Sequence, residues 1–383
     1  MIFDRLYRLI LLARCAAAFP LLGKATRVPR HPAVIIVVLS GKLGDIVCGT
    51  PVLRALRTHL PRARLVVAGA PVLAPLLQDS GLVDEYLDIE SKGGIGRIAA
   101  LRADAALITG PSFTPAALLY LAGVRLVVAP RVVGGFSPIA STVSYRILRR
   151  IIKTFPYQMG VYAPRERLRV LEPLGIFSDD TKKHLGFSET ASKKVENFFI
   201  DNGSNGKKDF VVGISTSAGN KIKEWPEERF AEVADYVIEK YRAKIVLIGG
   251  PGDREKVAKT KSHMKFGTHA LEIIDFSIDE LKALIAQLHL FIAVDTGPIY
   301  IAEAFDVPTI DIVGPMDEKE QPPRGSMHRR VLPPQRERPQ LSILNARGFD
   351  REEATRQTLS ITAEAVIREA DKLIRALHES RGN

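Results

Sequence analysis

An acidic residue in a glycine-bearing turn is the first candidate for chemistry. Asp45 ends the segment SGKLGD (40–45), which lies between a β-branched run and a helical pattern. A carboxylate at the start of a helix can simply cap free amides and complement the helix dipole. Alternatively, the glycines let another molecule approach, and Asp45 takes a proton from one of its hydroxyl groups. The turn matches neither GxGxxG nor the GK[ST] of a P-loop, so the sequence does not favour a dehydrogenase or a nucleotide triphosphatase.

A second set of candidates follows strand-like runs in the C-terminal half. Lys223 comes after the flexible segment SAGN (217–220) and could reach a phosphate group. The segment DTGP (295–298) ends a strand and begins a helix, whose free amides and positive dipole suit a diphosphate. Gly250 lies in GGPGD (249–253), which is either a similar ligand turn or an ordinary tight turn. Trp225, the single tryptophan, is predicted to anchor the core.

Alternating strands and helices must position these turns. The predicted strands are continuous apolar runs, as in buried parallel sheets, and they alternate with amphipathic helical patterns. They lie at 33–40, 64–69, 84–89, 104–109 and 124–129, and again at 209–216, 243–250, 270–275, 290–297 and 308–314. Such alternation predicts an α/β protein with two doubly wound, Rossmann-like domains. Ligands of such sheets bind at the carboxyl ends of the strands, where the candidate turns lie.

The pattern also predicts the domain limits. We expect a basic amphipathic segment over 1–30, an N-terminal Rossmann-like domain over 31–180 and a C-terminal one over 181–345. The last amphipathic helix, within 350–383, is expected to pack back toward the N-terminal domain.

Charge and composition narrow the class of protein. The chain has 383 residues, two cysteines and a formal charge of +11, which excludes a disulfide framework and indicates an acidic partner. Basic residues concentrate near both ends. The apolar run at 6–22 is interrupted by arginines and a proline, so it is too short to span a membrane. It is either an interfacial helix, with Leu6, Leu9 and Ile10 in lipid, or a helix packed on the protein itself.

Several motifs in order resemble one known family. They are LGD (43–45) with Thr50-Pro51, the KxWP segment (223–226), GGPGD (249–253), DTG (295–297) and Gly314-Pro315. This combination resembles glycosyltransferase family nine, the bacterial heptosyltransferases that build the lipopolysaccharide inner core. The likeness covers about residues 33–318. It implies a GT-B architecture, in which an acceptor-binding N-terminal domain and a donor-binding C-terminal domain face a central cleft.

The resemblance also implies roles for individual residues. Asp45 matches the general base and Lys223 the lysine that faces the donor diphosphate, so these two are the expected catalytic residues. The expected donor-binding residues are Gly44, Gly250, Phe276, Asp295, Thr296, Gly297 and Tyr300. Tyr300 stands where the family pattern has histidine, and it can donate a hydrogen bond but cannot carry a positive charge.

The expected activity is inverting transfer of a sugar, heptose from ADP-heptose, to an acidic lipid-linked or lipopolysaccharide core saccharide. No cofactor, metal or nucleic acid is expected, and the chain has no Asp-x-Asp motif. The expected location is the cytoplasmic side of the bacterial inner membrane, attached peripherally to its anionic surface. The alternatives that stay open are a GT-B enzyme that uses another nucleotide sugar or a related epimerase, and a non-catalytic membrane-apposed protein that binds a nucleotide sugar.

Overall fold

The computed structural model describes residues 2–204, 209–344 and 349–381. The chain divides into two compact units, with the change between His184 and Leu185, close to the predicted boundary after residue 180. The described residues after 348 belong to the second unit.

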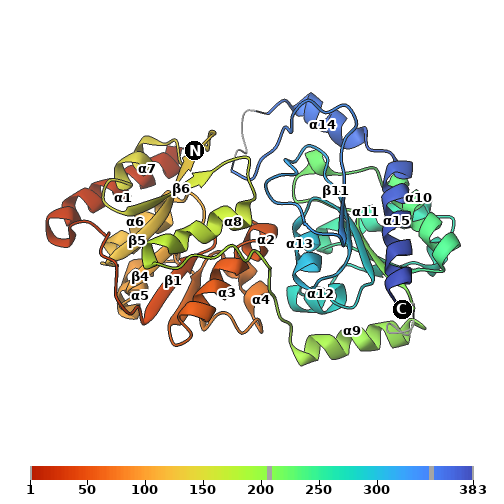
Figure 1. The fold of residues 1–383 in the computed structure, drawn as a ribbon, viewed down its shortest axis with the longest axis horizontal. Helices are drawn as coiled ribbons and strands as arrows, with labels where there is room; N and C mark the ends of the chain where they lie inside the picture. Colours follow the sequence, from red (N-terminus) through yellow and green to blue (C-terminus); the bar gives the residue numbers. More distant parts are fainter. Residues whose placement is uncertain (1, 205–208, 345–348, 382–383) are drawn as a thin grey trace. The chain divides into compact units, whose positions relative to one another are not determined.

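The first unit is built on a six-stranded parallel sheet (Figure 1). Its strands are β1 (Val34–Val38), β2 (Arg64–Ala68), β3 (Glu85–Leu87), β4 (Ala105–Ile108), β5 (Leu126–Val133) and β6 (Lys153–Gln158). Its helices are α1 (Ile2–Leu22), α2 (Leu43–Val47), α3 (Thr50–His59), α4 (Ala74–Leu77), α5 (Gly94–Leu101), α6 (Phe113–Leu121), α7 (Val143–Leu148) and α8 (Ala163–Leu168), with 3₁₀ turns η1 (Pro71–Leu73) and η2 (Arg169–Leu174). The strand order β3-β2-β1-β4-β5-β6 reverses direction between β1 and β4. This reversal is the switch point at which doubly wound sheets bind ligands.

The second unit repeats this design. Its strands are β7 (Val211–Ser215), β8 (Lys244–Ile248), β9 (Leu271–Ile273), β10 (Leu290–Val294), β11 (Thr309–Ile312) and β12 (His328–Val331), in the order β12-β11-β10-β7-β8-β9. Its helices are α9 (Glu189–Asp201), α10 (Glu227–Tyr241), α11 (Arg254–His263), α12 (Ile278–Ile285), α13 (Gly297–Ala304), α14 (Arg351–Leu359) and α15 (Ala363–Arg381), with 3₁₀ turns η3 (Lys221–Lys223), η4 (Pro251–Asp253) and η5 (Gly267–His269). The switch point lies between β7 and β10. The predicted fold class, two doubly wound α/β sheets, is confirmed.

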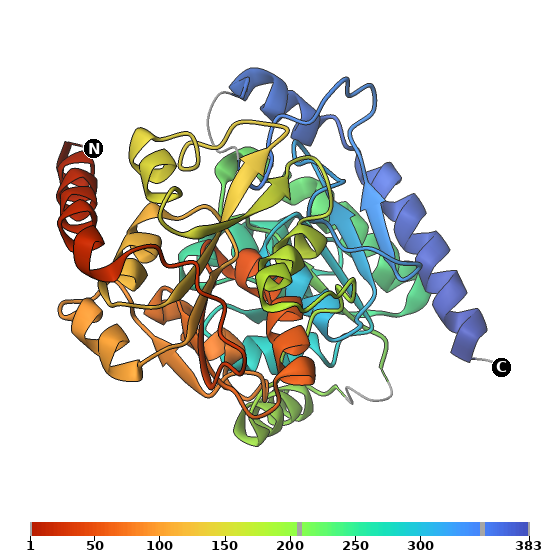
Figure 2. The same ribbon diagram turned by 60° about the vertical axis from the view of Figure 1, so that its left-hand side comes forward.

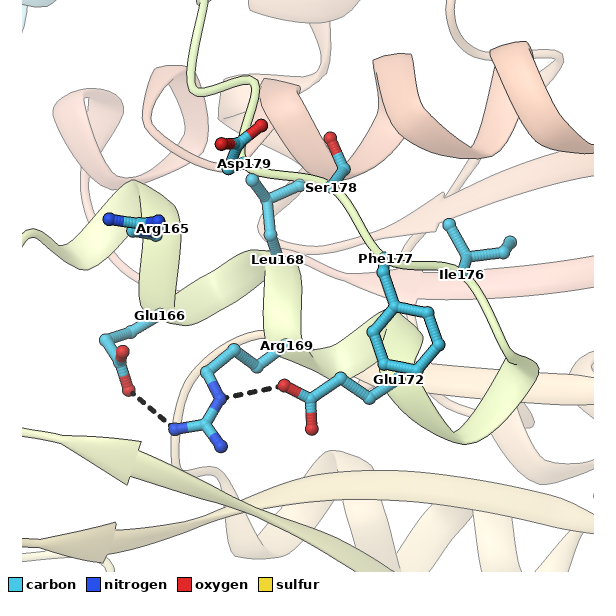
Figure 3. Close-up of a pocket in the computed structure, with 9 residues that line it drawn as sticks. All are labelled: Arg165, Glu166, Leu168, Arg169, Glu172, Ile176, Phe177, Ser178 and Asp179. Carbon is cyan, nitrogen blue, oxygen red and sulfur yellow. Dashed lines mark hydrogen bonds and ion pairs between the residues drawn. The ribbon is translucent and has the colours of Figure 1, made fainter.

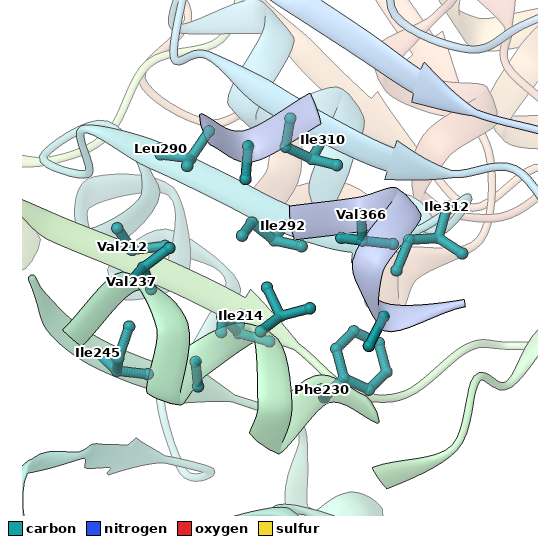
Figure 4. Close-up of a cluster of buried hydrophobic side chains, with 14 of the residues drawn as sticks. Val212, Ile214, Phe230, Val237, Ile245, Leu290, Ile292, Ile310, Ile312 and Val366 are labelled. Carbon is teal, nitrogen blue, oxygen red and sulfur yellow. The ribbon is translucent and has the colours of Figure 1, made fainter. Parts of the chain in front are cut away.

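The last helix corrects one expectation. Side chains from β7, β10 and β11 meet those of α10 and α15 in one apolar core of the second unit (Figure 4). Val366, Leu373 and Ile374 of α15 are fully buried in that core. The prediction that the last helix packs toward the N-terminal domain is therefore wrong. The apolar stripe of α15 already has a partner surface on the strands of its own unit.

The N-terminal helix packs on the protein itself and leaves part of its apolar surface exposed. α1 runs along the outside of the first unit beside α6 and α7 (Figures 1 and 2). Leu11 and Cys15 are buried in the core of that unit. Leu6, Leu9 and Ile10 point elsewhere and remain 53%, 60% and 49% exposed. Among the described residues, no helix is long and apolar enough to cross a membrane.

Candidate functional site

Asp45 lies in the first turn of α2, directly after β1 at the switch point of the first sheet. Its Oδ2 accepts a hydrogen bond of 3.0 Å from the backbone N–H of Lys42. Its Oδ1 accepts one of 2.8 Å from the guanidinium of Arg167, which also donates to the Asp45 carbonyl at 2.7 Å. The capping interpretation is therefore right in part. About a quarter of the Asp45 side chain is exposed, so a substrate can still reach it.

Arg167 is a site residue that the sequence analysis missed. It comes from α8 and is 122 residues away from Asp45 in the chain. Burial is the largest single effect and lowers the pKa of the guanidinium. The charges of Asp45, Tyr157 and Cys48 and the hydrogen bond to Asp45 together outweigh it, so the pKa of Arg167 is raised above its usual value. Arg167 is therefore a fixed cation that holds one carboxylate oxygen and the backbone carbonyl of Asp45.

Gly41 is the residue that makes room for this carboxylate. Its φ is +121°, and a Cβ atom added there would lie 2.4 Å from Asp45 Oδ2. Both the backbone conformation and the close approach require glycine.

Gly41→Ala is therefore expected to displace Asp45 and to lower transfer by about 10²-fold, the typical effect of a misplacement near 1 Å. The matched control is Gly96→Ala, at an exposed position of α5 where an added Cβ meets nothing within 4 Å. The control should keep full activity. Steady-state kinetics of both variants test the role of Gly41, and equal activities would contradict it.

The second unit brings Lys223, Asp295 and Tyr300 together at its own switch point. Lys223 lies in η3 after β7, and Asp295 follows β10. The Lys223 ammonium donates to the Asp295 carbonyl and, at 3.0 Å, to its Oδ2. The Tyr300 hydroxyl donates to the other carboxylate oxygen, Oδ1. Only 15% of the Lys223 side chain and 3% of the Asp295 side chain are exposed, so this is a largely desolvated ion pair.

The start of α13 lies next to this ion pair. Thr296 is the N-cap residue, and its side chain makes no capping hydrogen bond. Gly297 and Pro298 form the first turn, and proline suits this position because it needs no hydrogen-bond partner for its nitrogen. The free amides at the start of a helix carry positive potential, and the Lys223 and Asp295 pair lies beside them.

The turn that carries Lys223 is held by the C-terminal segment of the chain. Thr358 of α14 donates to the carbonyl of Ile222 at 2.8 Å. Trp225 is 1% exposed, and its indole N–H donates to the carbonyl of Ile361 at 2.8 Å. The prediction that Trp225 anchors the core is confirmed. The same contact fixes the position of Lys223, two residues earlier in the chain.

Three other predicted residues lie elsewhere. The Gly250 amide, after β8, donates to Asp253 at 2.9 Å, as in an ordinary tight turn. Phe276, after β9, packs edge to face on Phe198 of α9, with ring centroids 5.6 Å apart. β9 is three strands away from β10 in the sheet, so Phe276 is not in the Lys223 and Asp295 group. Gly44 is buried in α2 of the first unit.

Asp311 is a second site residue that the sequence analysis missed. It lies in β11, is fully buried, and is paired in register with Ala293 of β10. Within the described part of the chain, neither of its carboxylate oxygens has a hydrogen-bond partner. Burial first, and then the charge of Asp295, raise the pKa of Asp311 well above its ordinary range, although Lys223 acts in the opposite direction. The neutral acid is thereby favoured.

Replacing Asp311 by Asn should change how stability depends on pH. The pKa of Asp311 is raised in the folded protein, so above about pH 4 the folded state binds more protons than the unfolded state. The free energy of unfolding of the wild type therefore falls as pH rises through the folded pKa. The amide cannot ionise, so the variant lacks this fall, which amounts to as much as about 1.4 kcal/mol per pH unit.

The measurement is the free energy of unfolding of wild type and Asp311→Asn between about pH 5 and about pH 8. The free energy of unfolding of the variant should increase relative to that of the wild type as pH rises. Asp201→Asn, at an exposed carboxylate of α9, is the control. Its free energy of unfolding should differ from that of the wild type by the same amount at every pH. A constant difference for Asp311→Asn as well would mean that Asp311 is ionised across this range.

One cavity of the first unit lies beside α8, the helix that carries Arg167. It has a volume of about 520 Å³ and is lined by α8, η2 and residues 176–179 (Figure 3). Arg169 in its wall is paired with Glu172 at 2.9 Å and with Glu166 at 3.4 Å. Its charges are thus compensated within the wall, and none of the predicted site residues lines it.

Comparisons with known proteins agree with this arrangement. Residues 104–347 match the model of glycosyltransferase family 9 (heptosyltransferase). The chain is 24% identical over 290 residues to lipopolysaccharide heptosyltransferase 3 of Escherichia coli K12, covering 72% of this chain and 80% of that protein.

Solved structures of the same family have the same fold. The family 9 glycosyltransferase from Veillonella parvula superposes with a TM-score of 0.73 at 20% identity, covering 90% of this chain and 98% of that one. The Escherichia coli ADP-heptose lps heptosyltransferase II superposes with a TM-score of 0.71 at 18% identity, covering 90% and 99%. These are GT-B structures, as the sequence predicted. The family match spans more than half of the chain, and the protein is therefore a member of glycosyltransferase family 9.

Proposed function

We propose that this glycosyltransferase moves heptose from ADP-heptose onto a hydroxyl group of a lipid-linked or lipopolysaccharide core saccharide, with inversion at the anomeric carbon and without a metal ion. The observation that carries the proposal is the Lys223 and Asp295 pair beside the start of α13, at the switch point of the second sheet. Support for the substrates comes from the relatives, one named as a lipopolysaccharide heptosyltransferase and one as an ADP-heptose enzyme.

Asp45 acts on the acceptor in this mechanism. The acceptor oxygen attacks the anomeric carbon from the face opposite the diphosphate, and its proton passes to the Asp45 carboxylate. Arg167 and the Lys42 amide hold that carboxylate in one orientation, so little reorganisation is needed before proton transfer.

Lys223 and the first amides of α13, at Thr296 and Gly297, act on the donor. As the bond from the anomeric carbon to the diphosphate breaks, negative charge grows on the leaving ADP. Fixed cations and backbone amides stabilise such charge without moving. Asp295 holds the Lys223 ammonium in the required place, and Tyr300 holds Asp295. In this chain Tyr300 thus serves as a buried hydrogen-bond donor at the position of the family histidine.

The test is to measure nucleotide diphosphate release from a panel of nucleotide sugars, with lipopolysaccharide core acceptors and with added EDTA. ADP-heptose should be the best donor, EDTA should have no effect, and NMR of the product should show the inverted anomeric configuration. Faster nucleotide diphosphate release from another nucleotide sugar would favour the alternative, a GT-B enzyme with a different donor. Conversion of the sugar without an acceptor would identify an epimerase, and binding without turnover would identify a non-catalytic protein.

We also propose that the enzyme works at the cytoplasmic face of the bacterial inner membrane, attached peripherally. Support comes from exposed apolar side chains on two neighbouring helices, Leu6, Leu9 and Ile10 of α1 with Val143 and Ile147 of α7. Arginines such as Arg5 and Arg146 are exposed on the same helices. Apolar side chains surrounded by basic ones are typical of surfaces that bind anionic lipid.

Substitution of exposed residues is the appropriate test, because deleting α1 would remove Leu11 and Cys15 from the core. Leu6→Gln/Leu9→Gln should bind vesicles that contain phosphatidylglycerol at least about tenfold more weakly than wild type, because two apolar side chains no longer enter the lipid. Co-sedimentation measures the binding. Unchanged binding would exclude α1 as the membrane contact.

A further inference from the structure

A small basic cavity lies at the end of α1. It has a volume of about 230 Å³ and is lined by residues that follow α1, by the end of α6 and by the residues before β5. Its charged lining residues are Lys24, Arg27 and Arg125. This volume is below the roughly 300–1,000 Å³ of sites for drug-sized ligands, so it suits a small group such as a phosphate ester.

The three cations of this cavity have no acidic partner within the described part of the chain. Among the described residues, Lys24, Arg27 and Arg125 take part in no ion pair. Other arginines of this unit do have one, such as Arg57 with Asp84 at 2.6 Å and Arg54 with Asp180 at 2.9 Å. Three unpaired positive charges around one cavity favour an anion there.

The backbone that carries these cations is fixed. The Arg27 amide donates to the carbonyl of Arg125 at 3.1 Å, and Thr26 forms a bridge with Leu126 at the start of β5. The hydroxyl of Tyr120, which also lines the cavity, donates to the carbonyl of Gly23 at 2.8 Å. The positions from which the cations extend are therefore set before any ligand arrives.

Exposed apolar side chains lie close to the cavity in the chain. Leu21 is 91% exposed, Phe19 40%, Leu22 42% and Val28 47%. Leu22 also lines the cavity. A free inorganic anion would gain nothing from these side chains, whereas the acyl chains of a lipid would contact them.

The cavity is separate from the Asp45 site. Arg125 directly precedes β5, so the cavity lies at the edge where the parallel strands of the first sheet begin. Asp45 follows the end of β1, at the opposite edge of the same sheet. The cavity is therefore not part of the region that we assign to the acceptor hydroxyl.

We propose that this cavity binds the phosphate group of an anionic membrane phospholipid, with Lys24, Arg27 and Arg125 around the phosphate and Phe19, Leu21 and Leu22 against the acyl chains. The inference rests on the membrane association proposed above. The cavity would give the protein a defined site for one lipid headgroup, in addition to the general attraction between a basic helix and an anionic surface.

The experiment compares wild type with Arg27→Gln/Arg125→Gln and with the matched control Arg62→Gln/Arg102→Gln. The control removes two exposed arginines of the same unit that do not line the cavity. Co-sedimentation uses vesicles of phosphatidylethanolamine and phosphatidylglycerol, and vesicles of phosphatidylcholine alone. One basic residue at an anionic surface is worth about 1 kcal/mol, so the cavity variant should bind the anionic vesicles about thirtyfold more weakly, and the control less than about threefold.

A second measurement separates a lipid site from a general anion site. In calorimetric titrations, wild type should bind a soluble short-chain phosphatidylglycerol at least about tenfold more tightly than inorganic phosphate, because only the lipid contacts the apolar side chains. The cavity variant should lose this difference. Equal wild-type affinities for the two probes would overturn the proposal in favour of a free-anion site.

The possible failures can be told apart. Equal losses in the cavity variant and the control would overturn the headgroup site and leave membrane association intact. No binding of wild type to anionic vesicles would overturn both, while transfer to a soluble acceptor would still test the glycosyltransferase mechanism. Because Arg27 and Arg125 are exposed, the variants should keep the wild-type thermal midpoint. If the double variant unfolds, each single variant should still show about a fivefold loss.

Discussion

Asp45→Asn is expected to reduce sugar transfer by a factor of about 10² to 10⁴ per folded molecule, because an amide cannot take the acceptor proton. The affinity for the donor should stay within a few fold, since Asp45 acts on the acceptor. The measurements are single-turnover transfer rates and the dissociation constant of the nucleotide sugar.

The same substitution should also cost some stability. The two Asp45 oxygens accept from different donors, Lys42 N–H and the Arg167 guanidinium, and an amide can accept at only one of these positions. Leaving one buried donor without an acceptor costs about 1–3 kcal/mol. Rates must therefore be compared at a temperature where thermal unfolding shows that both proteins are folded.

Asp104→Asn is the matched control for this experiment. Asp104 belongs to the same unit, and one of its oxygens accepts from the amides of Ala33 and Val34 at 2.8 and 3.1 Å. It precedes β4 and so lies at the edge of the sheet opposite Asp45. This variant loses the same charge but should keep the wild-type rate. If Asp45→Asn also keeps its rate within about threefold, Asp45 only caps α2.

Of the ten predicted strands, eight are central in their sheets and are mostly apolar, which is what burial on both faces requires. Two strands were missed, β6 with the sequence KTFPYQ and β12 with HRRV. Both lie at the end of a sheet and have one neighbouring strand. An edge strand is partly solvated, so its sequence need not be apolar.

The residues of the site could be predicted only where a local sequence pattern identifies them. Asp45, Lys223 and Asp295 each follow a strand in a recognisable turn, and the sheet then brings Lys223 and Asp295 together. Arg167 is one of two arginines on α8, and nothing near it in the chain indicates that it contacts Asp45. In the sequence, Asp311 is simply a polar residue within a strand. Its raised pKa arises only from burial and from the nearby charge of Asp295.

Lys223→Met is expected to lower kcat/KM for the donor by a factor of about 10² to 10³, the usual effect of removing one group that stabilises transition-state charge. It should also unfold more easily. The Asp295 carboxylate is nearly fully buried, and taking the partner from a buried ion pair costs about 3–5 kcal/mol. A loss of activity in this single variant therefore has two possible causes.

The double variant Lys223→Met/Asp295→Asn separates them. It removes both charges, and the side-chain carbonyl of the introduced amide can still accept from the Tyr300 hydroxyl. Replacing a whole buried pair by neutral groups is often close to neutral for stability, so the thermal midpoint should return toward that of wild type. Transfer should stay low, because no cation faces the leaving diphosphate. Recovery of transfer to within about tenfold of wild type would show that Lys223 and Asp295 only stabilise the fold and that the donor diphosphate binds elsewhere.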